Sequence, residues 1–315
     1  MPLVSVVMPL YNKEADVGRA IESVLNQTVP DFELIVVNDG STDQGPEVVR
    51  SISDARIRVF DQENAGVSAA RNRGIHESRS DLIAFLDADD EWKPDFLETI
   101  LHLKEKYPSC SVFATNYVFR EVNGKYHSPI IRGLPLHPWE GVIEDYFAVA
   151  ARSDPPLWTS AVSVKKEALY AVSLFPEGVT LGEDLLTWAR LAAHYHIAYC
   201  SKVLAIYKLG YTGYQKPTSI PDLPDPVSGA LKKLLSEISL SKREWLRKYI
   251  ALWHKHRASM YLRLGWRWRT LIEVIKMGRY WVNKKLFLYV VCIFMPEQIL
   301  TTFLEKYQKK LSSLK

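Results

Sequence analysis

The sequence predicts an α/β protein with a doubly wound sheet, followed by a helical region. Short β-branched runs alternate with helical patterns through the first hundred residues, as a parallel sheet with crossover helices requires. Polar residues, among them Asn12, Asp39, Asn64 and Asp87, come directly after the strands, where such sheets bind ligands. Beyond residue 226 only helical patterns occur, which separates the C-terminal part from the sheet.

The first part of the chain is expected to form a βαβαβαβ series. Val17, Ile21 and Val24 fall on one face of the first helix, which is the pattern of an amphipathic helix. Residues 39–43 form a turn rich in helix-capping side chains. The expected strands and helices, in chain order, are Val4–Pro9, Ala15–Gln27, Phe32–Asn38, Gly45–Ser53, Arg56–Asp61, Val67–Ser78 and Leu82–Leu86.

Residues 97–225 are less regular, and their pattern does not fix how the strands pair. Prolines between Pro217 and Pro226 disfavour both helix and central strand, so Lys216–Val227 is the expected linker. The elements expected after residue 96 are helices near Leu97–Tyr107, Lys166–Val172 and Asp184–Ala193, strands near Ser111–Phe119 and Ala161–Val164, and then helices at Ser228–Ile238, Lys242–Leu264, Trp266–Trp281 and after Pro296.

The composition names no function, but the order of the charges is informative. The chain has 315 residues, enough to bury a large core, and its hydrophobic and charged fractions of 47% and 24% are ordinary. Residues 1–225 carry a net charge of −10, and residues 226–315 carry +14. Three dispersed cysteines without metal-ligand spacing fit a reducing compartment. We expect neither a signal peptide nor a transmembrane segment, and therefore a cytoplasmic protein.

Three carboxylates follow the fourth expected strand, in the stretch Asp87-Ala88-Asp89-Asp90. They would repel one another and lose hydration unless a positive charge lay among them. Oxygen ligands of this kind suit Mg²⁺ or Mn²⁺, which usually bind together with a substrate's phosphates. The alternative is that Asp89 and Asp90 cap the helix expected to begin near Lys93.

Five short segments, in this order and at these intervals, resemble the inverting family 2 glycosyltransferases. The segments are Ser5–Asn12, Val37–Asp43, Asn64–Gly74, Leu86–Asp90 and Gly182–Trp188. The resemblance covers roughly residues 1–210 and implies a GT-A fold with a doubly wound mixed sheet. We therefore expect a catalytic domain over residues 1–220, with donor binding in 1–95 and the acceptor side in 96–220, and a basic helical region over 221–315.

The resemblance implies that Pro9, Tyr11, Asp39, Arg71 and Asp87 bind the donor nucleotide. Tyr11 would lie against the base, unless it only packs at the strand edge. Asp39 would accept a hydrogen bond from a pyrimidine N–H, unless it serves a turn or a helix cap. Arg71 would pair with the diphosphate, and a structural ion pair with a nearby Asp is its alternative.

The resemblance also implies the metal ligand. Asp89 would bind the cation, and Asp87 would contact the ribose or the metal. Asp90 is either a second ligand or a helix cap. Many members of the family carry a histidine or arginine segment near the position of Lys208, and Lys208 is a candidate to replace that cation.

Asp184 matches the residue that serves as catalytic base in the resembling family. Its neighbour Glu183 is expected to face elsewhere if a helix starts at this point. Without the resemblance, the two acids would be read as favourable charges at a helix N-terminus. Trp188, one turn further along, either walls the acceptor site or packs in the core.

The C-terminal part combines its charge of +14 with five tryptophans. Basic and aromatic residues on amphipathic helices are typical of segments at a membrane interface, and the apolar run Leu286–Met295 would dip into the headgroup boundary. The alternative is that these helices pack on the acidic catalytic domain or form a dimer surface in a homo-oligomer. No motif supports nucleic-acid binding.

These observations predict a metal-dependent inverting hexosyltransferase. It would transfer a sugar from a nucleotide sugar, with a UDP-sugar favoured, to a hydroxyl of a glycan or lipid-linked saccharide, as in bacterial surface polysaccharide synthesis. The expected location is the inner face of the cell membrane. The alternatives are a nucleotidyltransferase, whose glycine-rich loop is missing from Pro9–Lys13, and a degenerate scaffold that binds nucleotide sugar or lipid.

Overall fold

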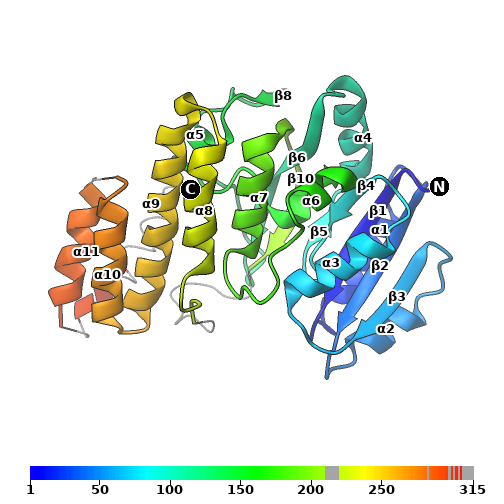
Figure 1. Cartoon of the computed structure of the whole chain (residues 1–315). Coiled ribbons are helices and arrows are strands. Elements are labelled where there is room, and N and C mark those ends of the chain that lie inside the picture. Colours follow the sequence, from blue (N-terminus) through cyan, green and yellow to red (C-terminus); the bar gives the residue numbers. More distant parts are fainter. Residues whose placement is uncertain (210–219, 282–283, 297–298, 301, 304–305, 307–315) are drawn as a thin grey trace.

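The computed structural model describes residues 1–209, 220–281, 284–296, 299–300, 302–303 and 306 (Figure 1). Its strands are β1 (Val4–Leu10), β2 (Phe32–Asp39), β3 (Ile57–Gln62), β4 (Leu82–Phe85), β5 (Glu91–Trp92), β6 (Cys110–Arg120), β7 (Tyr126–His127), β8 (Glu140–Ile143), β9 (Val162–Lys165) and β10 (His196–Lys208). Within the described residues they form a ten-stranded mixed sheet in the order β3-β2-β1-β4-β9-β6-β10-β5, with β7 beside β6 and β8 beside β10.

The helices cover this sheet and then extend beyond it. Those of the first two hundred residues are α1 (Val17–Leu25), α2 (Gly45–Ser51), α3 (Val67–Glu77), α4 (Phe96–Lys106), α5 (Tyr146–Ala150), α6 (Lys166–Ala171) and α7 (Glu183–His194), with a 3₁₀ turn at Thr159–Ala161. The last four described helices are α8 (Pro226–Glu237), α9 (Leu240–Arg263), α10 (Arg267–Gly278) and α11 (Lys284–Phe294).

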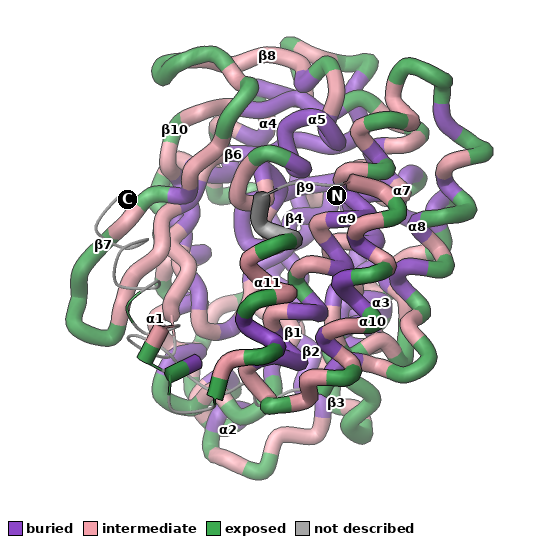
Figure 2. The backbone as a smooth tube through the Cα atoms, turned by 90° about the vertical axis from the view of Figure 1, so that its left-hand side faces the viewer, coloured by how far each residue is buried: buried purple, intermediate pink, exposed green. Residues whose placement is uncertain are grey.

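The four parallel strands β3, β2, β1 and β4 confirm the doubly wound half of the prediction. Every residue of β2 and β4 is buried, as expected for strands covered by helices on both faces (Figure 2). Since these strands are parallel, their carboxyl ends meet at one edge. Residues that follow β1, β2 and β4 are therefore brought together there.

The other half of the sheet is mixed, as the fold class requires. Strand β9 runs antiparallel to both β4 and β6, and β10 runs parallel to β6. Strand β10 is not predicted by the sequence pattern. Its register against β6 shifts at three places: between His196 and Ile197, between Cys200 and Val203, and between Val203 and Ala205. Because of these shifts, the sequence of β10 shows no regular alternation of buried and exposed residues.

The basic C-terminal part divides into two layers (Figure 1). Residues of α8 and of the first half of α9, such as Leu231, Tyr249 and Trp253, share one apolar core with strands β4, β6 and β9. Helices α10 and α11 lie outside, where Val274 and Ile293 pack on Ala258 of α9. Packing on the acidic half, one of the two expected alternatives, therefore holds for α8 and α9.

Among the described residues, the helices are either too short or too polar to cross a bilayer. Two sequence expectations fall partly on residues that are not described. The linker Lys216–Val227 includes residues 216–219, and most of the segment after Pro296 lies outside the described residues. Residues 220–225 are not helical, and α8 begins at Pro226.

Gly74 sets how closely α3 approaches β1. A Cβ atom at Gly74 would lie 2.4 Å from Cγ1 of Val7, which is buried in the core, so Gly74→Ala should destabilise the protein by about 2 kcal/mol through overpacking. The matched control is Gly229→Ala at an exposed position of α8, where a Cβ meets no atom within 4 Å and helix propensity predicts a gain of about 0.5 kcal/mol. Urea unfolding of both variants measures the two effects, and equal stabilities would contradict the close approach.

Candidate active site

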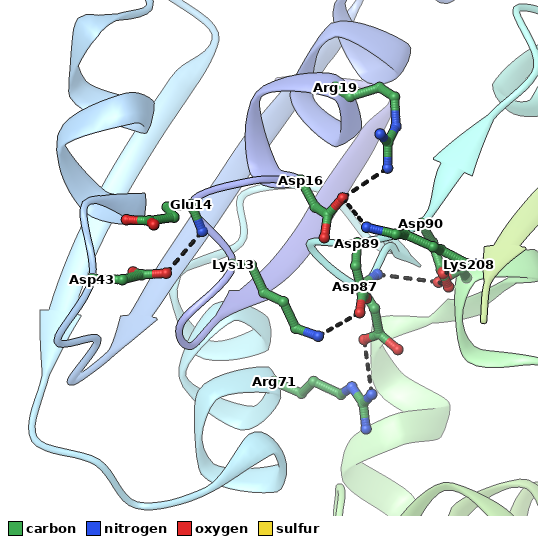
Figure 3. Close-up of polar contacts among 11 residues, drawn as sticks. Lys13, Glu14, Asp16, Arg19, Asp43, Arg71, Asp87, Asp89, Asp90 and Lys208 are labelled. Atoms are coloured by element: carbon green, nitrogen blue, oxygen red, sulfur yellow. Dashed lines mark hydrogen bonds and ion pairs between the residues drawn. The ribbon is translucent and has the colours of Figure 1, made fainter. Parts of the chain in front are cut away.

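Charged side chains from several elements converge at the carboxyl edge of the parallel strands (Figure 3). Lys13 follows β1, Arg71 projects from α3, Asp87 and Asp89 follow β4, and Lys208 ends β10. These positions are distant in the sequence, and the topology of the sheet brings them to one place.

Arg71 lies at the centre of this group and is 3% exposed. Its two terminal nitrogens bond the carboxylate of Asp87, at 2.9 Å, and that of Glu183, at 3.2 Å. Burial lowers the pKa of Arg71, but the attraction of the two carboxylates outweighs it and raises that pKa. The structural ion pair that was the alternative for Arg71 is therefore present.

Glu183 and Asp184 open α7, directly after Gly182 with a φ of +80°. A Cβ atom on Gly182 would lie 2.5 Å from the ring of Trp253, so only glycine fits between α7 and α9 here. Glu183 does not face away as expected, because it bonds Arg71.

The carboxyl group of Asp184 is a weaker acid than an ordinary aspartate side chain. Its pKa is raised to about 7, first by burial and then by the negative charge of Glu183, while Arg71 opposes the shift. A carboxylate with this pKa is a stronger proton acceptor near neutral pH than an ordinary one. This buried environment beside Glu183 and Arg71 suits the role that the resemblance implied for Asp184, which stays a prediction.

Lys13 was not singled out from the sequence, although it follows the turn at Tyr11 and Asn12. Its ammonium lies 2.5 Å from Oδ2 of Asp89. Burial lowers the pKa of Lys13, but the hydrogen bond and charge of Asp89 overcome this and raise it. Lys13 therefore stays protonated and places its positive charge beside Asp89, the residue predicted to bind the metal.

Lys208 also pairs with an acid, since its ammonium lies 2.5 Å from Asp16 and its backbone N–H donates to Asp90. A cation does stand at this end of β10, as its sequence position suggested. Its partner Asp16 was not predicted, because it lies 192 residues earlier in the chain.

Asp90 differs from the two acids before it. The chain turns after Asp87, whose carbonyl accepts from the Asp90 N–H at 3.0 Å, and this turn directs Asp90 inward. Its carboxyl group is fully buried and accepts from the Ser160 hydroxyl at 2.5 Å and from the Lys208 N–H at 3.0 Å. Burial, with the charges of Asp87 and Asp89, raises its pKa well above the ordinary value.

The capping alternative for Asp89 and Asp90 is wrong. The following helix α4 begins only at Phe96, its N-cap residue is Asp95, and no side chain caps it. Asp89 instead pairs with Lys13, and Asp90 bonds Ser160 and Lys208.

Asp39 holds the loop that leads into α3. Its carboxylate accepts from the side chain of Gln62 at 2.7 Å and from the backbone N–H groups of Ala65 and Gly66, both at 2.9 Å. These bonds reach residues 23 to 27 positions away and are neither an Asx-turn nor a helix N-cap, so the contacts of Asp39 do not match its alternative. Oδ2 accepts only one of these bonds, so it has a second lone pair for a ligand's N–H.

The remaining predicted residues take different places. Pro9 lies within β1, and Tyr11, on the loop after that strand, is 48% exposed. Trp188 is fully buried between Phe85 and Phe175, so it packs in the core and does not wall the acceptor site.

The site fits a cation that is shared with a substrate. Asp87 and Asp89 offer oxygen ligands, and the ammonium of Lys13 already stands in for a positive charge on Asp89. Mg²⁺ and Mn²⁺ are commonly held by one or two carboxylates together with phosphate oxygens, and this arrangement supplies the carboxylates.

In the described part of the chain, one group of three potential metal ligands has its donor atoms within 4.8 Å of one another. It consists of Asp225, His254 and Glu273, and it lies among the C-terminal helices. The guanidinium of Arg257 lies 3.4 Å from Asp225 and 3.6 Å from Glu273, so the protein already supplies positive charge there. We therefore interpret it as a buried ion-pair network.

Residues 5–163 match the model of glycosyl transferase family 2, about half of the chain. The chain belongs to this family. Relatives of this family 2 member include an uncharacterized glycosyltransferase of Rickettsia bellii, 35% identical over 64% of the chain, and glycosyltransferase GlyA of Streptococcus pneumoniae, 35% identical over 41%. The matched segments span 28% and 19% of those two proteins, well under their full length.

Among solved structures, the fold resembles that of TarS residues 1–349 from S. aureus. The TM-score is 0.67 for the structure in complex with UDP-GlcNAc, at 18% identity over 91% of this chain and 83% of that one. The structure of TarS with UDP gives a TM-score of 0.59 over 84% of this chain and 71% of that one. The GT-A fold expected for a family 2 glycosyltransferase is therefore confirmed.

Replacement of Arg71 tests its central position. Arg71→Met should destabilise the protein by about 3 kcal/mol, because it leaves the carboxylates of Asp87 and Glu183 without their cation. Arg73→Met, two residues away on the same helix, is the matched control. Arg73 is half exposed; it pairs with Glu77 one turn along and lies 5.7 Å from the centre of the Phe60 ring, so its loss should change stability by less than about 1 kcal/mol. Denaturant midpoints compare the variants, and a small effect at both positions would contradict the central role.

Proposed function

We propose that the chain is a metal-dependent inverting glycosyltransferase that transfers a hexose from a UDP-sugar to a hydroxyl of a glycan or lipid-linked saccharide. The carrying observation is Asp184, a carboxyl group with a pKa of about 7 beside the cluster that includes Arg71 and Asp87. TarS was crystallised with UDP-GlcNAc and with UDP, which supports a UDP-sugar as donor. The proposed setting is surface polysaccharide synthesis at the inner face of the membrane.

In the proposed reaction, Asp184 takes the proton from the acceptor hydroxyl. The acceptor oxygen then forms a bond to the anomeric carbon from the face opposite the leaving group, and the bond from that carbon to the diphosphate breaks. The configuration at the anomeric carbon is therefore inverted, and the nucleoside diphosphate leaves with the electron pair.

The other residues bind and orient the donor. Tyr11 lies against the base, and the second lone pair of Asp39 Oδ2 accepts from the base. Asp87, held by Arg71, contacts the ribose or the metal. Mn²⁺ or Mg²⁺ on Asp89 would offset the charge of the diphosphate.

Lys13 and Glu183 have supporting roles in this scheme. Lys13 balances the charge of Asp89 until the metal arrives. Glu183 orients Arg71 and helps keep the pKa of Asp184 near neutrality.

Asp184 is tested by substitution and by pH. Asp184→Asn should lower kcat by about 10³-fold, because the amide cannot accept the proton, while Kd for UDP stays within about twofold. The wild-type rate should rise with pH through about 7, as Asp184 loses its proton. Glu183→Gln removes a charge that raises the pKa of Asp184, so the midpoint of this profile should move to lower pH.

Two results would contradict this assignment. Full activity of Asp184→Asn would remove Asp184 as the base. UDP binding with no transfer or donor hydrolysis by the wild type, across a panel of acceptors with Mn²⁺, would favour a nucleotide-binding scaffold.

The metal site is tested through Lys13. Lys13→Met removes the ammonium that pairs with Asp89 and that would repel a metal ion bound there. The interaction of two unit charges about 4 Å apart is worth about 1–4 kcal/mol. Mn²⁺ binding without nucleotide, measured by titration calorimetry, should therefore become about tenfold tighter or more. Lys202→Met, which removes the exposed partner of Asp95, should leave Mn²⁺ affinity unchanged. Weaker Mn²⁺ binding by Lys13→Met would place the ion away from Asp89.

A further inference from the structure

We propose that the outer faces of α10 and α11 form a docking surface for an anionic lipid bilayer. This inference assigns the residues of the contact, and it rests on exposure and charge, not on the proposed transfer reaction. It depends on α10 and α11 because α8 and the first half of α9 are packed into the apolar core that they share with the sheet.

Helix α10 carries an exposed apolar stripe. Trp268, Ile272 and Ile275 are between 37% and 73% exposed, and their spacing of four and three residues places them on one face of the helix. The opposite face of α10, with Val274 and Met277, is buried.

Helix α11 repeats this arrangement. Phe287, Val291 and Phe294 are between 36% and 76% exposed, again at a spacing of four and three residues. Its other face carries Cys292 and Ile293, which are buried. Figure 2 shows exposed segments along α11 on this side of the molecule.

Neither stripe is used to build the described fold. Val274 of α10 and Ile293 of α11 pack together on Ala258 of α9, so each stripe lies on the side of its helix that faces away from that cluster. Large apolar side chains gathered on two neighbouring helices are unusual on a free soluble surface and mark a site of contact.

The charge of this region favours a lipid occupant over a second copy of the chain. Residues 226–315 carry +14, so two such surfaces placed face to face would repel each other. Arg279, the exposed C-cap residue of α10, falls at a helical spacing that places it on the face of the stripe. Basic residues close to an anionic leaflet are attracted to it, and Trp and Phe are suited to the headgroup boundary.

Helix α9 links the docking surface to the start of α7, which carries the proposed base, Asp184. Trp253 of α9 packs against Gly182, two residues before Asp184, and the same helix supports α10 and α11. A bilayer bound on α10 and α11 would therefore hold the site at a fixed position relative to a lipid-linked acceptor.

Co-sedimentation with vesicles tests the proposal without any sugar donor, so its outcome does not depend on the proposed reaction. The full chain should bind vesicles of 70% phosphatidylcholine and 30% phosphatidylglycerol, and salt should weaken that binding. The triple variant Trp268→Ser, Phe287→Ser, Phe294→Ser should bind at least about tenfold more weakly, since it removes three aromatic side chains whose apolar surface the bilayer would bury. Arg279→Gln should weaken binding to the anionic vesicles by about fivefold.

A matched double variant controls for general loss of surface hydrophobicity. Val122→Ser, Leu136→Ser removes two exposed apolar side chains elsewhere, and its vesicle binding should equal that of the wild type. Melting curves should show all variants folded, because every replaced side chain is exposed.

Three results would overturn the proposal. One is a wild type that does not bind the anionic vesicles, and another is a triple variant that binds them as the wild type does. The third is a wild-type dimer, seen by light scattering, that the triple variant converts to monomer, because a second copy would then occupy the face.

Discussion

The structure of the site depends on one buried cation. Arg71 bonds Asp87 at the end of β4 and Glu183 at the start of α7, so a single guanidinium fixes the carboxyl end of β4 against the helix that carries Asp184. Because a buried charge without a partner is costly, neither carboxylate can leave Arg71 without destabilising the fold. The same constraint keeps Glu183 next to Asp184, and this proximity contributes to the raised pKa of Asp184.

A chain of alternating charges surrounds this centre. Asp89 pairs with Lys13, and Asp16 pairs with both Lys208 and Arg19. Arg19 also bonds Glu91, which extends the series to β5. The acidic residues Asp16, Asp89 and Glu91 are thus balanced by cations of the protein itself. A divalent ion bound at Asp89 would therefore compete with a lysine that is already in place.

The C-terminal helices have two separate roles in the fold. Helices α8 and α9 complete the catalytic core, and the buried pair of His254 and Glu273, 2.7 Å apart, ties α9 to α10. The positive charge of this region and its aromatic residues were evident from composition. Composition did not reveal that Trp253 is a core residue while Trp268 is 73% exposed, because both follow the same local helical pattern.

The sequence by itself determined the parallel half of the sheet and the family. Strands buried on both faces read as continuous apolar runs, and the five motifs lie within short segments, so local pattern suffices. Only the tertiary structure decided which charges meet. Arg71 and Glu183 are 112 residues apart, and Lys13 and Asp89 are 76 apart. The sequence around one residue of such a pair does not indicate which residue is its partner. The ion pair of Lys208 with Asp16 depends in addition on the position of strand β10, whose irregular register hides its alternation in the sequence.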